Sequence, residues 1–383
     1  MPATICDRHR SFLPTLAFLA GLLAGGGCKQ VPSPTSPVLA TMTSVPSVSF
    51  LSADDPRFRY EGRFDLAAPA RPVVIWQGSR MALDFSGDTL VLHFAEAKGQ
   101  NFFDAEIDGR RTLVSVPEGA STLLPLSVPT STENRHRLTL FKRSEAAAGI
   151  VCFTGVGLAA EATAWSPPAP AYKLRIQFIG DSITVGACNE DGATDQWEDR
   201  RTHNHALSYA TLTSLAFQAD HRAIAVSGMG VTIGYVEPKA GQIWDRVYPE
   251  PSSPRADLTA WQPDVVLVNL GENDDSFSRN SGLAFPAAEF TRGYVALARA
   301  IRTAYPHAEL VLLRGGMHGG KNGSELRAAW ESAVRQIETG DSAATHFVFE
   351  HWSANHPRVA DDRAMAEELI AWLKVQPFFA RYL

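Results

Sequence analysis

Short apolar runs separated by turn residues fill the chain from residue 49 to about residue 163. In several of these runs apolar and polar residues alternate, which is the pattern of a strand with one buried face. Four of the runs lie at 73–76, 89–94, 103–107 and 137–141. Asp108-Gly109 follows the third run, and Asp-Gly between strands is typical of a tight hairpin. Short strands at this spacing predict an all-β, jelly-roll sandwich domain over 49–163.

A proline-rich break at 166–170 precedes a second pattern, and we expect a linker at 164–171. Beyond it, continuous apolar runs alternate with longer stretches of helical periodicity, and an uninterrupted apolar run is typical of a strand buried in a parallel sheet. The expected strands are 174–179, 222–226, 264–270, 309–313 and 346–350, and the expected helices are 205–217, 290–305, 324–338 and 361–374. This alternation predicts a three-layer α/β domain with a parallel sheet over 172–383.

The residues before the predicted sandwich have the composition of an export segment. Positive residues precede an apolar run at 12–23 that is too short to cross a bilayer, and small residues then lead to Cys28. Cys28 resembles a bacterial lipoprotein cleavage site, where the cysteine is acylated, although cleavage by an ordinary signal peptidase also fits. We therefore expect 1–28 to be a signal peptide of ordinary or lipoprotein type, and 29–48 to be a tether rich in Pro, Ser and Thr. The protein would then be exported to the periplasm, outer membrane or cell surface, with membrane attachment through a lipid if Cys28 is acylated.

Composition and charge limit the kinds of molecule that this protein is expected to bind. The chain of 383 residues has a net charge of -6 and no cluster of Lys and Arg that could neutralise a phosphate backbone. Nucleic acid is therefore not an expected partner, whereas a neutral polysaccharide remains one. The sequence contains no CxxC, HExxH or P-loop pattern, so we expect neither a metal nor another cofactor. Cys152 and Cys188 lie beyond the predicted signal, and the sequence leaves open whether they form a disulfide.

Chemically unusual residues follow three of the predicted parallel strands. They are Gly-Asp-Ser at 180–182, Ser-Gly-Met-Gly at 227–230 and Gly-Glu-Asn-Asp at 271–274, and a His-Pro pair at 356–357 precedes the last predicted helix. In open parallel sheets, sites form beyond the carboxyl ends of the strands. We therefore expect these residues to gather at one edge of the sheet.

The residue types at these positions suit acyl transfer. Ser182, which enters a predicted helix, can act as a nucleophile, and His356 can act as its general base. Gly228 allows close backbone approach and Asn273 supplies a side-chain amide. Together with the backbone of Ser182, these two residues are suited to form an oxyanion hole.

Each of these residues also has an ordinary structural interpretation. Ser182 can be a helix cap, Gly228 can form a tight turn, and Asn273 can form an Asx turn at a strand end. The order of the motifs, each at a strand end, favours catalysis over these alternatives. Three further histidines compete with His356 for the role of base, namely His318, His346 and His351.

The four blocks in this order resemble the SGNH, or GDSL, hydrolases, a family named after Ser, Gly, Asn and His residues in four separate blocks. The sequence lacks the G-x-S-x-G motif that surrounds the nucleophile of ordinary α/β-hydrolases. The stretches 62–65, 76–79 and 107–109 further resemble the N-terminal domain of carbohydrate esterase family 2, in which a jelly roll precedes an SGNH domain.

The resemblance implies a serine esterase that works without a metal and removes acetyl groups from polysaccharides such as xylan and mannan. Its substrate and partner would be an acetylated polysaccharide or oligosaccharide. It also implies that Ser182 and His356 are catalytic, and that Ser182, Gly228 and Asn273 form the oxyanion hole.

The sequence departs from the family pattern close to the histidine. SGNH enzymes usually carry an Asp three residues before it, and here that position is Ser353. We therefore expect a Ser–His dyad in which a backbone carbonyl holds the ring, with Ser353 or Glu350 as weaker orienting groups. Glu272, in place of the commoner Thr or Gly of its block, is a second and smaller departure.

Two alternative functions stay open. The protein could be an esterase acting on lipid or peptidoglycan acyl groups, or a catalytically weak surface protein that binds carbohydrate. The missing Asp favours the second alternative, whereas the intact Ser182, Asn273 and His356 oppose it. Four aromatic residues at loop-like positions could stack on sugar rings or simply pack, namely Trp197, Tyr235, Trp244 and Trp352.

Overall fold

Two antiparallel sheets form the first part of the fold. The computed structural model describes residues 48–383, so the predicted signal peptide, nearly all of the predicted tether and Cys28 lie outside the described residues. The first sheet has the order β3–β4–β11–β6–β9, with β1 paired to β11, and the second has the order β12–β5–β10–β7–β8, with β2 paired to β5. The first sheet contains β1 (Val48–Ser52), β3 (Phe64–Asp65), β4 (Val73–Val74), β6 (Thr89–Gly99), β9 (Gly119–Ser127) and β11 (Gly149–Ala159). The second contains β2 (Arg59–Glu61), β5 (Arg80–Ser86), β7 (Asn101–Ile107), β8 (Arg110–Val116), β10 (Arg135–Lys142) and β12 (Ala164–Trp165).

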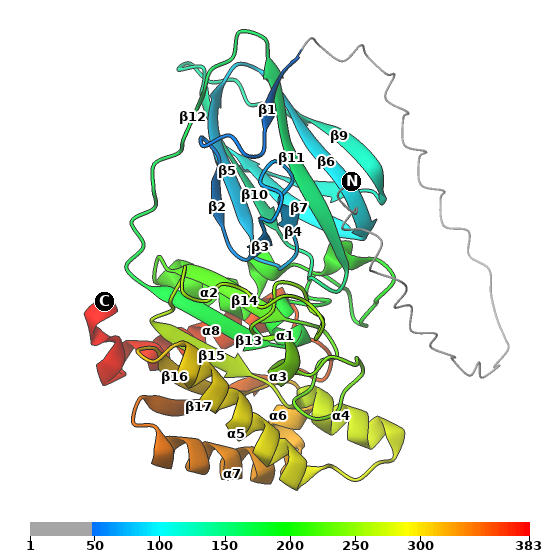
Figure 1. The fold of residues 1–383 in the computed structure, drawn as a ribbon. Helices are drawn as coiled ribbons and strands as arrows, with labels where there is room; N and C mark the ends of the chain where they lie inside the picture. The colour runs from blue at the N-terminus through cyan, green and yellow to red at the C-terminus, as the bar shows by residue number, and fades with distance from the viewer. Residues whose placement is uncertain (1–47) are drawn as a thin grey trace, which may run out of the picture. The chain divides into compact units, whose positions relative to one another are not determined.

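The two sheets enclose a core of aromatic and aliphatic side chains, and the predicted sandwich is confirmed (Figure 1). Alternate residues of β10 are buried, as the two-residue period of a strand requires. The predicted hairpin also forms, because Asp108 and Gly109 adopt φ angles of 51° and 81° and join β7 to β8 in a two-residue turn. β12 pairs with β5, so the first two residues of the predicted linker belong to the sandwich.

A parallel sheet of five strands follows, in the order β14–β13–β15–β16–β17. Every residue of the central strand β15 is buried, which explains its continuous apolar run. The strands are β13 (Arg175–Gly180), β14 (Asp220–Ala225), β15 (Val265–Asn269), β16 (Glu309–Gly316) and β17 (Ala344–Trp352).

Helices cover both faces of this sheet, so the predicted three-layer α/β architecture is confirmed (Figure 1). Side chains of α5 and α7 pack on one face, and side chains of α2 and α8 pack on the other. The α-helices are α1 (Ser182–Val185), α2 (Tyr209–Ala216), α3 (Ala240–Ile243), α4 (Glu272–Ser281), α5 (Ala287–Ala304), α6 (His318–Asn322), α7 (Ser324–Gly340) and α8 (Val359–Lys374). Short 3₁₀ helices are η2 (Arg200–Thr202), η3 (His205–Leu207) and η4 (Pro377–Tyr382).

The sandwich and the α/β part share a hydrophobic core. Ile75 and Trp76 of the sandwich pack in the same cluster as Trp244 of the α/β part. The indole N–H of Trp76 donates to the carbonyl oxygen of Val247 at 2.7 Å. Residues 48–383 consequently form one compact unit. Within this range, no helix combines the length and apolar character needed to cross a membrane.

Candidate active site

Three adjacent strands bring the predicted site residues together. Ser182 follows β13, Gly228 follows β14 and Asn273 follows β15, and β13 lies between the other two strands. The chain runs from β13 to β14 on one side and then from β14 to β15 on the other side of β13, so the strand order reverses here. Ligands bind at such topological switch points. The prediction that the three motifs gather at one edge is confirmed.

Ser182 and His356 are in direct contact. The Nε2 atom of His356 lies 2.8 Å from Ser182 Oγ, which is the geometry of a nucleophile bonded to its general base. Two of the competing histidines have other partners, since His346 pairs with Glu338 and His351 pairs with Asp361. The third, His318, lies at the start of α6 with its ring 6.5 Å from that of Trp352. The structure therefore selects His356 as the base for Ser182.

Asp195 completes the arrangement from the long connection between β13 and α2. Its Oδ2 atom lies 2.6 Å from His356 Nδ1 and accepts a hydrogen bond from the backbone N–H of His356 at 3.3 Å. Ser182, His356 and Asp195 thus form a catalytic triad in geometry. The expected dyad is wrong, because a carboxylate from another loop takes the place of the Asp missing before the histidine.

Neither predicted orienting group contacts the His356 ring. The Ser353 hydroxyl donates to the carbonyl oxygen of Asn355 at 2.5 Å. The Glu350 side chain is 88% exposed and lies 4.0 Å from Lys321. Both residues are near His356 in sequence, but their side chains have other neighbours.

Asp195 is held as a carboxylate by its neighbours. Burial alone would raise its pKa, but the hydrogen bond and charge of His356, together with Arg358, outweigh burial and hold the pKa of Asp195 well below its usual range. Arg358 Nη1 lies 2.8 Å from Asp195 Oδ1 and also donates to the carbonyl oxygens of Cys188 and His356. Arg358, which sequence reasoning missed, therefore ties the loop of the acid to the loop of the base.

Gly228 has the backbone conformation expected of an oxyanion-hole residue. Its φ angle is 82°, and an added Cβ atom would approach Tyr235 Cβ to 3.1 Å, so a larger residue would be strained here. Within residues 48–383, the backbone N–H groups of Ser182 and Gly228 have no hydrogen-bond acceptor. Both groups are therefore available to a substrate oxygen.

Asn273 joins the three strand ends. Its Nδ2 atom donates to Asp181 Oδ2 and to the carbonyl oxygen of Met229, each at 3.1 Å. Burial raises the pKa of Asp181 to about 8. The amide therefore contacts the residue before Ser182 and the residue after Gly228, and it must share one of its two hydrogen atoms to bind an oxyanion.

The two acidic residues on either side of Asn273 hold neighbouring loops in place. Asp274 accepts hydrogen bonds from three successive backbone N–H groups at 231–233, directly after the Gly228 turn. Glu272, the smaller departure from the family pattern, accepts from the N–H groups of Gly319 and Gly320 at 3.0 and 3.1 Å. Glu272 therefore braces α6 against α4 and does not reach Ser182.

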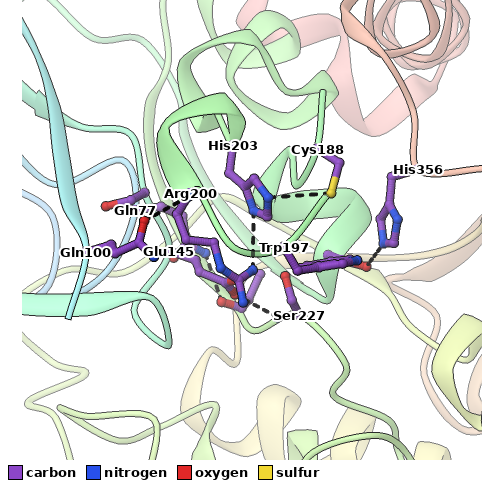
Figure 2. A network of polar contacts seen from close by, with 12 residues as sticks. Gln77, Gln100, Glu145, Cys188, Trp197, Arg200, His203, Ser227 and His356 are labelled. Atoms are coloured by element: carbon purple, nitrogen blue, oxygen red, sulfur yellow. Dashed lines mark hydrogen bonds and ion pairs between the residues drawn. The ribbon is translucent and has the colours of Figure 1, made fainter. Parts of the chain in front are cut away.

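The aromatic candidates separate into different environments. Trp244 is buried in the core, whereas Tyr235 and Trp352 are 48% and 36% exposed. Trp197 lies edge-on to the His356 ring with 5.0 Å between ring centroids, and Figure 2 shows the two side chains next to each other. Trp197 therefore contacts the catalytic base directly.

Cys188 lies beside the triad and offers ligand-type atoms. Together with Asp191 and His203, or with Asp195 and His356, it places three such atoms within 4.8 Å of one another. Burial raises the pKa of the Cys188 thiol, which opposes the thiolate that a metal requires. The thiol lies 3.5 Å from His203 Nε2 and does not pair with Cys152. The donor chemistry therefore gives no reason to assign a metal here.

Comparisons with known proteins agree with this geometry. Residues 60–168 match the family model of the carbohydrate esterase 2 N-terminal domain, and residues 178–367 match that of the GDSL-like lipase/acylhydrolase family. The chain is 32% identical over 334 residues to the cellulase/esterase CelE of Acetivibrio thermocellus, covering 84% of this chain but only 40% of that relative. It is 25% identical over 335 residues to an acetylxylan esterase/glucomannan deacetylase of Cellvibrio japonicus, covering 82% of this chain and 89% of the relative.

A solved structure shows the same relationship along nearly its whole length. A family two carbohydrate esterase from Clostridium thermocellum, in complex with cellohexaose, superposes with a TM-score of 0.73 at 30% identity. The match covers 83% of this chain and 98% of that one. With the sandwich, the SGNH fold and the four motif residues in place, the chain belongs to carbohydrate esterase family 2.

Proposed function

We propose that this protein is a serine esterase that removes O-acetyl groups from a polysaccharide of the xylan or mannan type. The single observation that carries the proposal is the contact chain from Ser182 Oγ to His356 Nε2 at 2.8 Å and from His356 Nδ1 to Asp195 at 2.6 Å. A serine, histidine and carboxylate in this order, next to backbone N–H groups, are the elements of acyl transfer.

The reaction proceeds through an acetyl-enzyme. Ser182 Oγ attacks the acetyl carbonyl carbon while His356 Nε2 takes the hydroxyl proton, and Asp195 stabilises the imidazolium. The backbone N–H groups of Ser182 and Gly228, with the amide of Asn273, stabilise the oxyanion. His356 then returns the proton to the sugar oxygen, which leaves as a hydroxyl group. A water molecule deprotonated by His356 attacks the acetyl group on Ser182. The bond between Ser182 Oγ and the acetyl carbon then breaks, His356 returns the proton to Ser182 Oγ, and the acetyl group is released as acetic acid, which ionises to acetate.

Two observations support a polysaccharide as the substrate. The relatives include an acetylxylan esterase/glucomannan deacetylase and an esterase in complex with cellohexaose. In addition, the exposed rings of Tyr235 and Trp352 lie on the segments that follow β14 and precede His356. An exposed aromatic face suits the apolar face of a pyranose ring.

The geometry of the triad also bears on the two alternative functions. A catalytically weak binding protein was favoured by the missing Asp, and Asp195 removes that argument. An esterase acting on lipid or peptidoglycan acyl groups uses the same triad, so only the substrate separates it from the proposal. The family models, one of which is specific to carbohydrate esterases, favour a polysaccharide.

We also propose that the protein is exported and attached to a membrane through a lipid on Cys28. The support is the positive, apolar and small-residue pattern that ends at Cys28. Replacing Cys28 by Ser and fractionating the cells tests this: the native protein should sediment with membranes and C28S should not. Equal distribution of both proteins would contradict lipid attachment.

Acetate release from a panel of substrates tests the proposed function. The panel contains acetylated xylan, acetylated glucomannan, O-acetylated peptidoglycan and a long-chain acyl ester, with the native protein compared with His356→Ala. The proposal expects the highest kcat/KM on one of the plant polysaccharides and its loss in the variant. Faster release from peptidoglycan or the lipid ester would assign the alternative esterase. Glycan binding without release from any substrate would assign the binding protein.

A further inference from the structure

A loop of the sandwich reaches the edge of the active site. The connection between β10 and β11 carries Glu145, which is only 1% exposed although its side chain is acidic. The buried Lys142 fixes this connection, since its ammonium donates to the carbonyl oxygens of Ser144, Glu145 and Gly149 at 2.9–3.3 Å. The backbone of Glu145 is therefore held before any substrate binds.

The Glu145 carboxylate bonds to two segments of the catalytic part. Its Oε2 atom accepts a hydrogen bond from the backbone N–H of Ser227 at 2.8 Å. Ser227 directly precedes Gly228, so this bond fixes the entry to the oxyanion-hole turn. The Oε1 atom lies 3.4 Å from Arg200 Nη1. One carboxylate thus contacts both the oxyanion block and the loop that supplies Asp195.

Arg200 connects Glu145 to the catalytic histidine through an aromatic ring. Its guanidinium carbon lies 4.9 Å from the centre of the Trp197 ring, which is a cation–π distance. Trp197 in turn packs edge-on against His356 with 5.0 Å between centroids. Figure 2 shows Glu145, Arg200, Trp197 and His356 in this sequence, with Ser227 next to Glu145.

Two further sandwich residues hold the same loop on either side of Asp195. Gln100 accepts a hydrogen bond from the backbone N–H of Arg200 at 2.9 Å and donates to the carbonyl oxygen of Glu198 at 2.7 Å. Arg143, paired with Asp104 of β7, forms an ion pair with Glu190. The segment from 190 to 200 is therefore anchored to the sandwich at both ends.

We infer that Glu145 is a positioning residue of the active site, and that the sandwich is part of the catalytic apparatus through it. Glu145 acts through Ser227 on the oxyanion hole, and through Arg200 and Trp197 on the orientation of His356. The inference rests on the proposed esterase reaction of Ser182 and assigns the sandwich a role that does not depend on glycan binding.

If Glu145 only attached the sandwich to the α/β part, breaking another such contact should lower kcat by the same factor. The ion pair of Asp220 provides this control. Asp220 forms an ion pair with Arg80 of the sandwich at 2.8 Å, and both side chains are largely buried. Asp220 is the first residue of β14, whereas Ser227 lies two residues beyond its last residue, Ala225. Asp220→Asn therefore breaks a comparable contact between sandwich and sheet at the opposite end of the same strand.

The test compares Glu145→Gln with Asp220→Asn in the full chain, using a small chromogenic acetate ester and acetylated xylan. We expect Glu145→Gln to lower kcat about 10- to 100-fold, with KM changed less than about 2-fold, because misplacement of catalytic groups affects the transition state. We expect Asp220→Asn to leave kcat within about 2-fold of native. Unchanged kcat in Glu145→Gln, or equal losses in both variants, would overturn the inference.

A second variant and a second readout cover the cases in which Glu145→Gln does not fold or the native protein releases no acetate. If Glu145→Gln does not fold, Arg200→Gln breaks the same chain at a more exposed residue, and unchanged kcat there overturns the inference. If the native protein releases no acetate, the proposed function fails, and the low-field proton resonance of the His356–Asp195 hydrogen bond becomes the readout. That resonance should be broadened or lost in Glu145→Gln and kept in Asp220→Asn, and its persistence in both variants would overturn the inference.

Discussion

His356 engages a different loop with each of its two ring nitrogens, and this division sets the chemistry of the site. Nε2 faces Ser182 after β13, and Nδ1 faces Asp195 in the connection to α2. The bond to Asp195 fixes which nitrogen carries the proton in the resting state, so that Nε2 is free to accept one from the serine.

Replacing Asp195 by Asn tests the third member of the triad. The amide can donate to Nδ1 and thereby favour the wrong tautomer, so we expect kcat to fall about 10²- to 10⁴-fold. Steady-state kinetics beside Asp199→Asn provide the comparison, because Asp199 lies in the same loop and pairs with Arg201 at the surface. Native kcat in Asp195→Asn would remove Asp195 from the mechanism.

Replacing Asn273 by Ala tests the oxyanion hole. Loss of one donor should lower kcat about 10²- to 10³-fold. The matched change is Asn280→Ala on the same helix, whose side chain donates to Tyr235 at the surface and which should keep its kcat. If Asn273→Ala kept full activity, the amide would serve only to tie Asp181 to Met229.

Sequence reasoning singled out Ser182, His356, Gly228 and Asn273, because each follows or precedes a strand or helix whose pattern is strong. It missed Asp195 because the loop from 190 to 199 contains five acidic residues and no periodicity, so no spacing singles one out. The partner of a histidine is decided by how two loops meet in space, and that information lies in the packing of Arg358 and Trp197 against them.

Helices with a strong apolar periodicity were predicted correctly, whereas helices with a weak periodicity were not. The apolar stripes near 290–305 and 324–338 became α5 and α7. The expected helix at 205–217 is broken because Ser208 is extended and caps α2, its side chain accepting from the N–H of Thr211. α4 has a mostly polar sequence and no apolar stripe, so no helix was predicted there.

The start of α8 makes stability depend on pH. Asp362 is buried in its first turn, where it accepts from the N–H of Tyr209 and from Asn189, and burial raises the pKa of Asp362 to about 8. In the unfolded chain its pKa is about 3.9. The folded state therefore holds a proton that the unfolded state has lost between these values. This contribution to stability is complete below about pH 4 and is lost as the pH rises through about 8.

Asp362→Asn should reduce this loss of stability with rising pH. Between pH 5 and pH 8 each such proton contributes about 1.4 kcal/mol per pH unit to the free energy of unfolding. Burial lowers the pKa of His205 to about 4, and this residue therefore contributes with the opposite sign. The quantity to compare is thus the slope of the free energy of unfolding against pH in the native protein and in the variant. Urea unfolding at several pH values measures it, and parallel curves would contradict the assignment.

The whole molecule is held together by a core that crosses from the sandwich into the α/β part. Trp76 is 1% exposed and packs among residues of the α/β part, while Arg63 of the sandwich donates to the carbonyl oxygens of Trp244 and Arg246. The sequence predicted two architectures correctly but not this shared core, because hydrophobic periodicity shows that a face is buried and not what covers it.

Trp76→Ala should destabilise both parts together. Truncating a buried Trp removes about 3–5 kcal/mol of stability, and the shared core should unfold in one transition. Calorimetry of the native protein and variant measures this, and the melting temperature of the whole transition should fall. Separate transitions, with only the sandwich affected, would contradict a shared core.

Acetate release from acetylated xylan by the native protein and by Ser182→Ala tests most directly whether Ser182 is the nucleophile of an esterase, with circular dichroism to confirm that both proteins are folded. We expect release by the native protein and a fall of several orders of magnitude in the variant, because Ser182 Oγ is the hydroxyl that lies 2.8 Å from His356 Nε2. Release at the native rate by folded Ser182→Ala would contradict the serine esterase mechanism.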